Sequence, residues 1–306
     1  MDQSLTESHG TEPQRIILPI LVLYNMRLSH STTYQTFVAS SRQGGLDQAF
    51  VAVYDNSPTP QVNPAEESHL LAYKHDPANS GLAAAYNWAL DIAKLHEISW
   101  LLLLDQDSTL SSEFLESSLL QACLHHRNEG IAGIVPVIRS CGLVVSPMRV
   151  GFGRLKSLPH STFGIQSEEI MAINSGAAIR CDFVRSIGGF NRAYWLDYQD
   201  HWLFHQIYAS GRKVVISNCI LDHKLSVQDY RHEVSTKRYR SILNGEAAFI
   251  TTHKSHFEII LYLLRLFCRC LKLLLVVRNL RMAAITMMML KKIAMHPLRS
   301  LEVLPR

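Results

Sequence analysis

Short apolar runs alternate with segments of helical periodicity through the first half of the chain. Each apolar run predicts a buried strand, and residues 81–95, which carry apolar side chains at helical spacing, predict a helix between two of them. This alternation indicates an α/β fold with a mostly parallel sheet, in which ligands bind at the carboxyl ends of the strands. The runs that predict strands lie at residues 16–23, 50–54, 70–73, 100–104 and 131–138.

The composition excludes several classes of protein. Of the 306 residues, 47% are hydrophobic and 18% are charged, whereas disordered chains combine low hydrophobicity with high net charge. With 15 glycines and 11 prolines, the chain is neither collagen-like nor of low complexity. Its six cysteines include no Cys-x-x-Cys pair. They are too sparse for a disulfide scaffold and indicate neither a zinc site nor a thioredoxin-like site, which favours a reducing cytosol.

The sequence divides into three parts. Residues 1–14 are polar and acidic, which predicts a disordered tail and not a signal peptide. Residues 15–252 form the expected α/β domain. Residues 253–306 hold ten Lys and Arg against two Glu, so their net charge is +8 and the rest of the chain carries −4. Such a basic tail, rich in Leu and Met, predicts an anionic partner.

Two interpretations of the basic tail stay open. Arg265, Arg269 and Lys272 fall on one stripe at helical spacing, which predicts a helix lying at a membrane surface. The same charges interrupt the apolar run, so the tail is not an ordinary membrane span. A membrane is favoured over nucleic acid because the tail is strongly apolar and nearly free of aromatic residues after Phe267. The periodicity fits equally well two helices that pack on the α/β domain.

Two carboxylates follow the apolar run at 100–104. Asp105 and Asp107, one residue apart at a strand end, can hold a divalent cation, and their hard oxygen ligands suit Mg²⁺ or Mn²⁺. Such a metal would neutralise a diphosphate and help it leave. The alternative is a plain turn in which Asp107 or Ser108 caps the next helix.

Several motifs in consistent order resemble the inverting family 2 glycosyltransferases. The similarity is greatest to the bacterial rhamnosyltransferase-type members that build surface polysaccharides, and it covers roughly residues 15–226. The resemblance implies a GT-A fold, a nucleotide-sugar donor and a metal-dependent, single-displacement transfer. The motifs are Asp55-Asn-Ser57, Asn79 to Asn87, Trp100 to Ser108, Asn174-Ser-Gly176, Ile187 to Phe190 and Leu196 to Asp200.

The resemblance implies roles for the residues near the donor. Asp55 would meet the nucleotide base, and Tyr24 with Asn25 would close the first strand. Asn79 and Gly81 would belong to a loop whose backbone approaches the diphosphate. Without the resemblance, the first of these motifs is a turn after a strand and the second is a helix start.

The resemblance also assigns a metal site. Asp105 would face the ribose or the metal, Asp107 would bind the metal directly, and His223 would be a third ligand of Mg²⁺ or Mn²⁺. A single histidine is more often structural than a ligand, and this chain has 15 of them.

Acidic residues near the start of a later helix supply the candidate base. By similarity to the family pattern Asp-x-x-Asp-x-Glu, Asp200 would take the proton of the acceptor hydroxyl, while Asp197 is a second candidate or a helix cap. The chain departs from the pattern, with Trp202 in place of the usual Glu and Gln206 in place of the usual Arg. Trp202 could therefore stack on a sugar of the acceptor, beside His201.

The sequence as a whole predicts an enzyme of surface polysaccharide synthesis. We expect transfer of L-rhamnose from dTDP-L-rhamnose to a lipid-linked glycan, by a protein peripheral to the cytoplasmic face of the bacterial inner membrane and without a nucleic-acid partner. One alternative is transfer of a hexosyl or galactofuranosyl unit from a UDP-sugar. Another is an inactive nucleotide-sugar-binding scaffold, which the joint presence of Asp105, Asp107, Asp200 and His223 argues against.

Overall fold

The computed structural model describes residues 16–43, 50–63, 69–151, 154–159, 162–222 and 235–295. Two predictions from the sequence fall on other residues, namely the polar tail at 1–14 and the metal ligand His223. Both predictions therefore lie outside the described residues.

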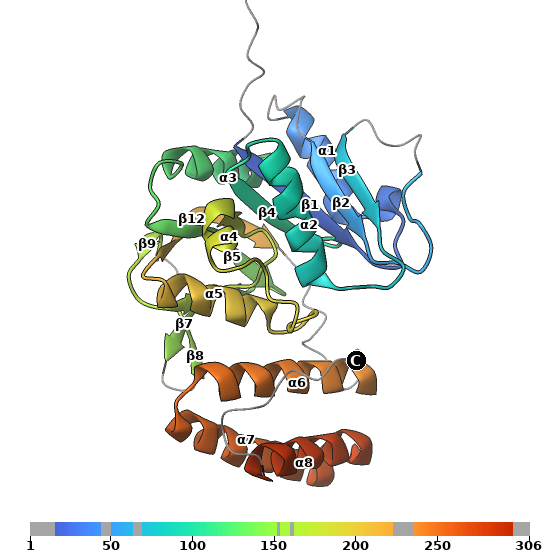
Figure 1. The fold of residues 1–306 in the computed structure, drawn as a ribbon, viewed down its shortest axis with the longest axis vertical. Coiled ribbons are helices and arrows are strands. Elements are labelled where there is room, and N and C mark those ends of the chain that lie inside the picture. Colours follow the sequence, from blue (N-terminus) through green and yellow to red (C-terminus); the bar gives the residue numbers. More distant parts are fainter. Residues whose placement is uncertain are drawn as a thin grey trace, which may run out of the picture.

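A large sheet forms the centre of the α/β body (Figure 1). Its strands follow the order β3-β2-β1-β4-β11-β5-β12-β9, and β6 also pairs with β5. Strands β1 to β4 are parallel to one another, and β5 is parallel to β12, whereas β11 is inserted antiparallel between β4 and β5. This mostly parallel sheet confirms the predicted α/β fold. The bounds are β1 Ile17–Leu23, β2 Val51–Asp55, β3 Leu70–His75, β4 Trp100–Asp105, β5 Ile131–Ser140, β6 Leu143–Ser146, β9 Gly164–Gln166, β11 Ala178–Arg180 and β12 Lys213–Asp222.

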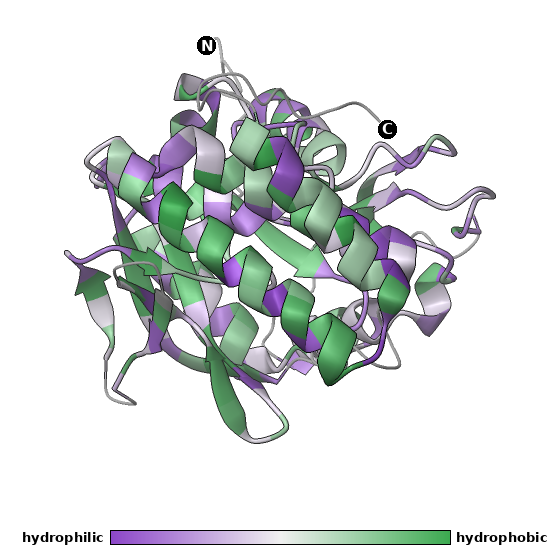
Figure 2. Ribbon diagram, turned by 90° about the horizontal axis from the view of Figure 1, so that it is seen from below, coloured by the Kyte–Doolittle hydropathy of each residue, from purple (hydrophilic) through white to green (hydrophobic). Residues whose placement is uncertain are grey.

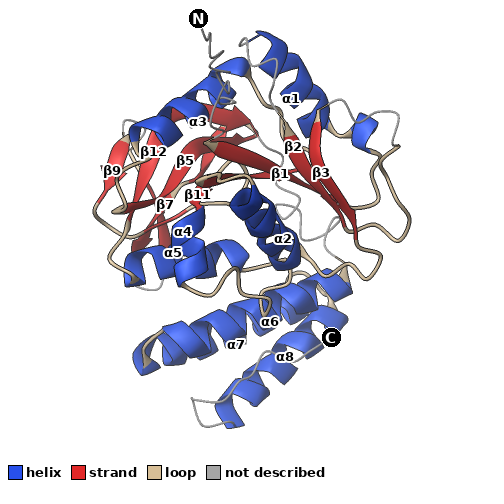
Figure 3. Cartoon of the chain, turned by 45° about the horizontal axis from the view of Figure 1, so that its top comes forward, coloured by secondary structure: helices blue, strands red, loops and turns tan. Residues whose placement is uncertain are grey.

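Helices cover both faces of this sheet (Figure 3), which explains the continuous apolar run of β4. Leu101 and Leu103 belong to the core beneath α2, α4 and α5, while Leu102 and Leu104 belong to the core beneath α1 and α3. Because successive side chains of a strand alternate between faces, a strand covered on both sides needs apolar residues at every position. The helices are α1 Thr32–Gln43, α2 Leu82–Leu95, α3 Ser112–Leu124, α4 Cys181–Ser186 and α5 Gln199–Ala209, with a short 3-10 helix at Leu28–His30.

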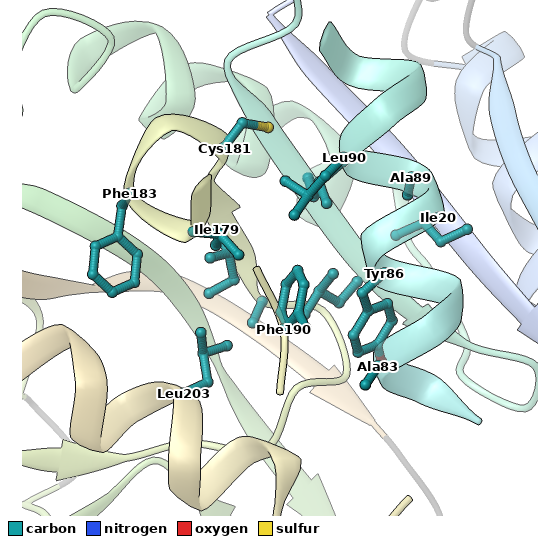
Figure 4. Close-up of a cluster of buried hydrophobic side chains, with 14 of the residues drawn as sticks. Ile20, Ala83, Tyr86, Ala89, Leu90, Ile179, Cys181, Phe183, Phe190 and Leu203 are labelled. Atoms are coloured by element: carbon teal, nitrogen blue, oxygen red, sulfur yellow. The ribbon is translucent and has the colours of Figure 1, made fainter. Parts of the chain in front are cut away.

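Helix α2 packs against a segment from the second half of the chain. Tyr86 is completely buried on α2, and its ring centroid lies 5.1 Å from that of Phe190 (Figure 4). The side chain of Asn87 donates to the carbonyl of Phe190 and accepts from its N–H, both at 2.8 Å. These contacts hold the segment before α5 against α2, beside the carboxyl ends of the first strands.

The stretch after β5 that is punctuated by Gly and Pro forms a second, smaller sheet. Its order is β10-β7-β8, and both pairings are antiparallel. The bounds of its strands are β7 Met148–Gly151, β8 Arg154–Ser157 and β10 Ile170–Met171.

Three helices form a separate layer below the α/β body (Figure 1), called the helical layer from here on. They are α6 Thr236–His253, α7 His256–Leu275 and α8 Leu280–Met295. The side chains of Ser235 and Ser255 cap α6 and α7, and Ser255 forms a reciprocal capping box with Glu258.

Helix α6 lies between the body and the other two helices. Ala248 and Phe249 of α6 belong to the core of the body, whereas Tyr239 and Leu243 belong to a core shared with α7 and α8. The predicted boundary at residue 252 thus falls at the end of a helix that packs against both units. The inner faces of α7 and α8 pack on each other and on α6, which lies between them and the body.

None of the helices in the described ranges is both long enough and apolar enough to cross a membrane. The longest, α7, has 20 residues, and Arg265, Arg269 and Lys272 interrupt its apolar sequence.

Candidate active site

The carboxyl ends of three neighbouring strands carry the first group of predicted residues. In the register of the sheet, Asp55 pairs with Leu23 and Asp105 pairs with Val22, so the two carboxylates lie on either side of the end of β1. This is the edge at which an α/β sheet binds ligands.

Asp55 is completely buried and organises the loop that follows β2. Its carboxylate accepts hydrogen bonds from the N–H of Ser57 at 3.0 Å, the N–H of Gln61 at 2.7 Å and the hydroxyl of Tyr73 at 3.0 Å. Burial and the bond to Asp55 raise the pKa of Tyr73, which keeps this hydroxyl a donor. Both carboxylate oxygens therefore bind groups of this chain, and the contact with a nucleotide base stays a prediction.

Tyr24 and Asn25 connect the end of β1 to the segments that follow β4 and β2. The N–H of Tyr24 donates to the side-chain oxygen of Gln106 at 2.8 Å, and the N–H of Asn25 donates to the hydroxyl of Ser57 at 2.8 Å. Asn25 has a φ of 51°, in the left-handed region that Asn tolerates better than most residues. The ring of Tyr24 is 49% exposed beside these loops.

The loop before α2 is held by its own side chains and by Trp195. The carboxylate of Asp76 accepts from the N–H of Ser80 at 2.9 Å, and the carbonyl of Asn79 accepts from the indole N–H of Trp195 at 2.8 Å. Gly81 has a φ of 87°, and a Cβ there would lie 2.2 Å from the Trp195 ring. In this structure, Trp195 therefore explains why residue 81 must be glycine.

Asp105 and Asp107 follow β4 at the same edge. The hydroxyl of Ser175 donates to the carboxylate of Asp105, and Asp107 is exposed. Within the described part of the chain, no three His, Cys, Asp or Glu side chains are grouped so that they could hold a metal ion. Two carboxylates still fit Mg²⁺, because this ion is commonly held by one or two carboxylates together with waters and substrate phosphates.

Asp197 is held by a helix of the layer below. The guanidinium of Arg238, on α6, donates to one oxygen of Asp197 at 2.9 and 3.1 Å. The Asp197 side chain is only 11% exposed, and its burial raises its pKa more than Arg238 lowers it. Asp197 is thus an anchor between α6 and the start of α5.

Asp200 lies in the first turn of α5. Burial raises the pKa of the completely buried Tyr86, and the negative charges of Asp105 and Asp200 raise it further. One oxygen of Asp200 accepts from the N–H of His201 at 2.8 Å. The role of Asp200 as the base stays a prediction.

The two predicted acceptor residues occupy different environments. Trp202 is only 5% exposed, belongs to the core of the body and packs 6.4 Å from the ring of Tyr194. In this arrangement it offers no exposed face to a sugar. His201 is half-buried and stacks on Tyr198 at 4.5 Å. An acceptor role for either residue stays a prediction.

Four residues that hold these groups in place were not predicted from the sequence. Ser175, in the motif Asn174-Ser-Gly176, donates to Asp105, and Gln106, between the two aspartates, accepts from the N–H of Tyr24. The resemblance assigned a role to neither. Trp195 and Arg238 contact residues that are 116 and 41 positions away, respectively. Pairs so distant leave no periodic signal in a single sequence.

A cavity of about 340 Å³ opens away from this site, at the amino end of β4. Its wall includes Arg180, whose guanidinium donates to the carbonyls of Ile131, His126, His125 and Asn128. The same guanidinium stacks on a ring of the core. This part of the cavity wall is structural, because it satisfies carbonyls at the end of α3 and the start of β5.

Comparison with known families identifies the chain. Residues 20–188, more than half of the sequence, match the family described as Glycosyl transferase family 2. The chain belongs to glycosyl transferase family 2. The matched range contains Asp55, Asp105 and Asp107 of this family 2 protein but ends before Asp197 and Asp200. No curated protein sequence matches this family 2 chain.

Solved structures similar to this family 2 protein include two with bound ligands. S. aureus TarS 1-349 in complex with UDP is 14% identical, with a TM-score of 0.48, and the alignment covers 86% of this chain and 73% of that one. The mannosyltransferase PcManGT from Pyrobaculum calidifontis, in complex with GDP-Man and Mn²⁺, is 15% identical, with a TM-score of 0.47 and coverage of 94% and 77%. Similarity at this level says nothing about the substrate of this family 2 protein.

Proposed function

We propose that this protein is an inverting glycosyltransferase that moves a sugar from a nucleotide-sugar donor to a lipid-linked glycan. The observation that supports this most is the place of two carboxylates, with Asp105 at the carboxyl end of β4, where an α/β sheet binds ligands, and Asp200 in the first turn of α5. One carboxylate on the donor side and one on the acceptor side are what a single displacement needs. The sugar we propose is L-rhamnose, supplied as dTDP-L-rhamnose.

The loops at the carboxyl ends of the strands would bind the donor. The exposed ring of Tyr24 offers a face on which a nucleotide base could stack. Asp55 would act through the loop that it holds, whose backbone groups surround the same edge. The loop from Asn79 to Gly81, held by Trp195, would present its backbone to the diphosphate.

Mg²⁺ or Mn²⁺ would be held by Asp105 and Asp107, with His223 as a further ligand. When bound, the cation would neutralise the charge of the diphosphate leaving group. The side chain of Ser175 would keep Asp105 oriented, since its hydroxyl donates to that carboxylate.

The transfer itself is a single displacement. The acceptor oxygen forms a bond to the anomeric carbon while the bond from that carbon to the diphosphate breaks, and the configuration inverts. The proton of the acceptor hydroxyl passes to the carboxylate of Asp200. Asp197 is less available to an acceptor hydroxyl because its side chain is only 11% exposed and one of its oxygens is paired with Arg238. The products are the glycosylated acceptor and a nucleoside diphosphate.

The acceptor would be anchored in the cytoplasmic face of the inner membrane, with the protein held peripherally beside it. A lipid-linked glycan remains at the bilayer, so the enzyme must work close to that surface. The basic charge of residues 253–306 supports this location.

A donor screen tests the proposal. Isothermal titration calorimetry with dTDP-, UDP- and GDP-sugars in Mn²⁺ should show the tightest binding for dTDP-L-rhamnose, and release of nucleoside diphosphate should show turnover. Preference for a UDP-sugar would instead indicate hexosyl or galactofuranosyl transfer. Binding without turnover would indicate an inactive scaffold, for which the Trp202 and Gln206 departures are the evidence. Binding of no nucleotide-sugar would contradict the proposed function.

A further inference from the structure

The outer face of α7 carries a continuous stripe of exposed apolar side chains. These residues, called the α7 ridge from here on, are spaced alternately by three and four positions, which places them on one side of a helix. Each is between 38% and 58% exposed. The α7 ridge consists of Phe257, Ile260, Leu264, Phe267, Leu271 and Leu274.

The opposite face of α7 is already covered. Its buried residues form a core with α6 and α8, so packing within the helical layer explains them. A helix that is apolar on both faces is normally buried on both, and α7 is buried on one. The buried residues are Ile259, Tyr262, Leu266, Cys270 and Leu273.

Helix α7 belongs to the layer that lies most distant from the sheet. In Figure 1, α7 and α8 lie below α6, and α6 lies below the body. Figure 2 views the same layer from below and shows hydrophobic segments along the helices that face the viewer. Contiguous exposed apolar patches of this kind mark sites of contact with a protein or a membrane.

The charges around the α7 ridge select between these partners. From residue 256 to residue 295 the sequence has seven Lys and Arg but one carboxylate, Glu258, which accepts the N–H of Ser255 in the capping box. Arg265 and Lys272 are exposed on one flank of the ridge. The predicted basic stripe changes in one respect, because Arg269 pairs with Glu246 of α6 at 2.7 and 3.0 Å.

We propose that the α7 ridge is the surface with which this protein docks on a bilayer of anionic phospholipids. Apolar side chains would enter the boundary between headgroups and acyl chains, and the basic flank would face the negative headgroups. A second copy of the chain fits less well, since two basic surfaces repel each other. The inference deepens the proposed location of the enzyme and rests on it, but not on the chemistry of transfer.

Docking through α7 would leave α6 between the bilayer and the body. Helix α6 is also the element whose Arg238 holds Asp197, three residues before the candidate base. The membrane surface and the catalytic region would therefore be connected by one helix.

Co-sedimentation of the full chain with vesicles tests the apolar part of the proposal. The variant Leu264→Ser, Phe267→Ser, Leu271→Ser should lower the affinity for phosphatidylglycerol-containing vesicles by about 100-fold or more, because these side chains are exposed in the free protein and buried in the bilayer. The matched control replaces three exposed leucines of the body, and its affinity should equal that of the wild type. The control residues, 63–76% exposed, are Leu95, Leu124 and Leu143, each changed to Ser.

The basic flank is tested separately. Arg265→Gln with Lys272→Gln should lower the affinity for anionic vesicles by about 30-fold at low salt, since each basic residue near such a surface contributes about fivefold. The same pair should change binding to neutral phosphatidylcholine vesicles little. The control Lys94→Gln with Arg127→Gln, two exposed residues of the body, should bind like the wild type.

Two outcomes would overturn the inference. In the first, the full chain stays in the supernatant with anionic vesicles. In the second, sedimentation velocity shows a dimer that the Ser variant of the α7 ridge abolishes while vesicle binding is unchanged, so that a second copy is the partner. Release of nucleoside diphosphate in the absence of vesicles is measured on the same proteins and should be unaffected. Failure of docking is thereby distinguished from failure of the proposed enzyme activity.

Discussion

The α/β body and the helical layer use apolar residues in different ways. In the body, strand β4 is buried on both faces, and the exposed leucines of α2 and α3 lie toward the ends of those helices, Leu95 on α2 and Leu120 with Leu124 on α3. In the helical layer, α7 buries one apolar face and exposes another along its whole length. The helical layer thus offers a partner an apolar surface along a whole helix, whereas the exposed leucines of α2 and α3 lie only toward their ends.

The two units also differ in how they use charge. The candidate catalytic carboxylates Asp105 and Asp200 belong to the body, whereas the exposed charges along α7 and α8 are almost entirely basic. An ion pair of Arg238 with Asp197 joins the two units, beside the apolar contacts of Ala248 and Phe249 with the core of the body. Changes in the body should therefore affect chemistry and leave vesicle binding intact, and changes in the layer should do the reverse.

The largest effect is expected from Asp107→Ala in the body. Loss of a metal ligand leaves the diphosphate charge unneutralised, so turnover should fall by about 10³-fold or more and no longer respond to Mn²⁺. Release of nucleoside diphosphate, titrated with Mn²⁺ and EDTA, measures this. Asp91→Ala, an exposed aspartate of α2, is the control. Normal turnover of Asp107→Ala would contradict the metal assignment.

Asp200→Asn tests the candidate base. The substitution keeps the size of the side chain and removes the proton acceptor, so kcat should fall by about 10²–10⁴-fold with donor affinity nearly unchanged. Steady-state kinetics and donor calorimetry separate the two quantities. Asp197→Asn is the comparison variant, and the assignment is wrong if that variant loses kcat to this extent while Asp200→Asn does not.

Arg238→Met tests the contact between the two units. It leaves the largely buried carboxylate of Asp197 unpaired, which should lower the free energy of unfolding by about 1–3 kcal/mol. Urea unfolding measures the loss. The double variant with Asp197→Asn should recover part of it, because the uncompensated charge is gone. Equal losses in the single and double variants would mean that the ion pair does not stabilise the contact.

A pH dependence of the free energy of unfolding is expected from His253, at the end of α6, which lies beside His205 of the body. Burial, with smaller effects of His205 and Lys254, lowers the pKa of His253 from 6.5 to about 4. Between these values the unfolded chain takes up a proton that the folded chain does not, so the free energy of unfolding is full above pH 6.5 and falls toward pH 4. His253→Gln should flatten this slope, and His96→Gln, an exposed control, should not. Thermal unfolding across pH 4–7 distinguishes them.

The sequence predicted those parts of the structure that local patterns encode. The run at 100–104 identified β4 because a strand covered on both faces needs apolar residues throughout. The antiparallel insertion of β11 was not predicted, because a strand of three residues contains no local pattern that identifies the strands with which it pairs. The pairing of Arg269 with Glu246 was not predicted either. Helical spacing shows on which side of a helix a residue lies, but not which residue of another helix it contacts.

The candidate site shows the same division. The apolar run at 100–104 was sufficient to place Asp105 and Asp107 at the end of a strand, at the edge where ligands bind. The roles of Ser175 and Trp195 depend on the packing of distant segments. The sequence also could not indicate that Trp202 would be buried, because an aromatic residue on a helix fits a core and a binding face equally well.

The central claim is that chemistry resides in the body and membrane contact in the helical layer. Its most direct test is the rate of nucleoside diphosphate release, measured without vesicles, for the wild type, for Asp200→Asn and for the Ser variant of the α7 ridge. We expect a wild-type rate for the ridge variant and a rate lower by about 10²–10⁴-fold for Asp200→Asn. A ridge variant that loses activity as Asp200→Asn does, while remaining folded, would contradict the claim.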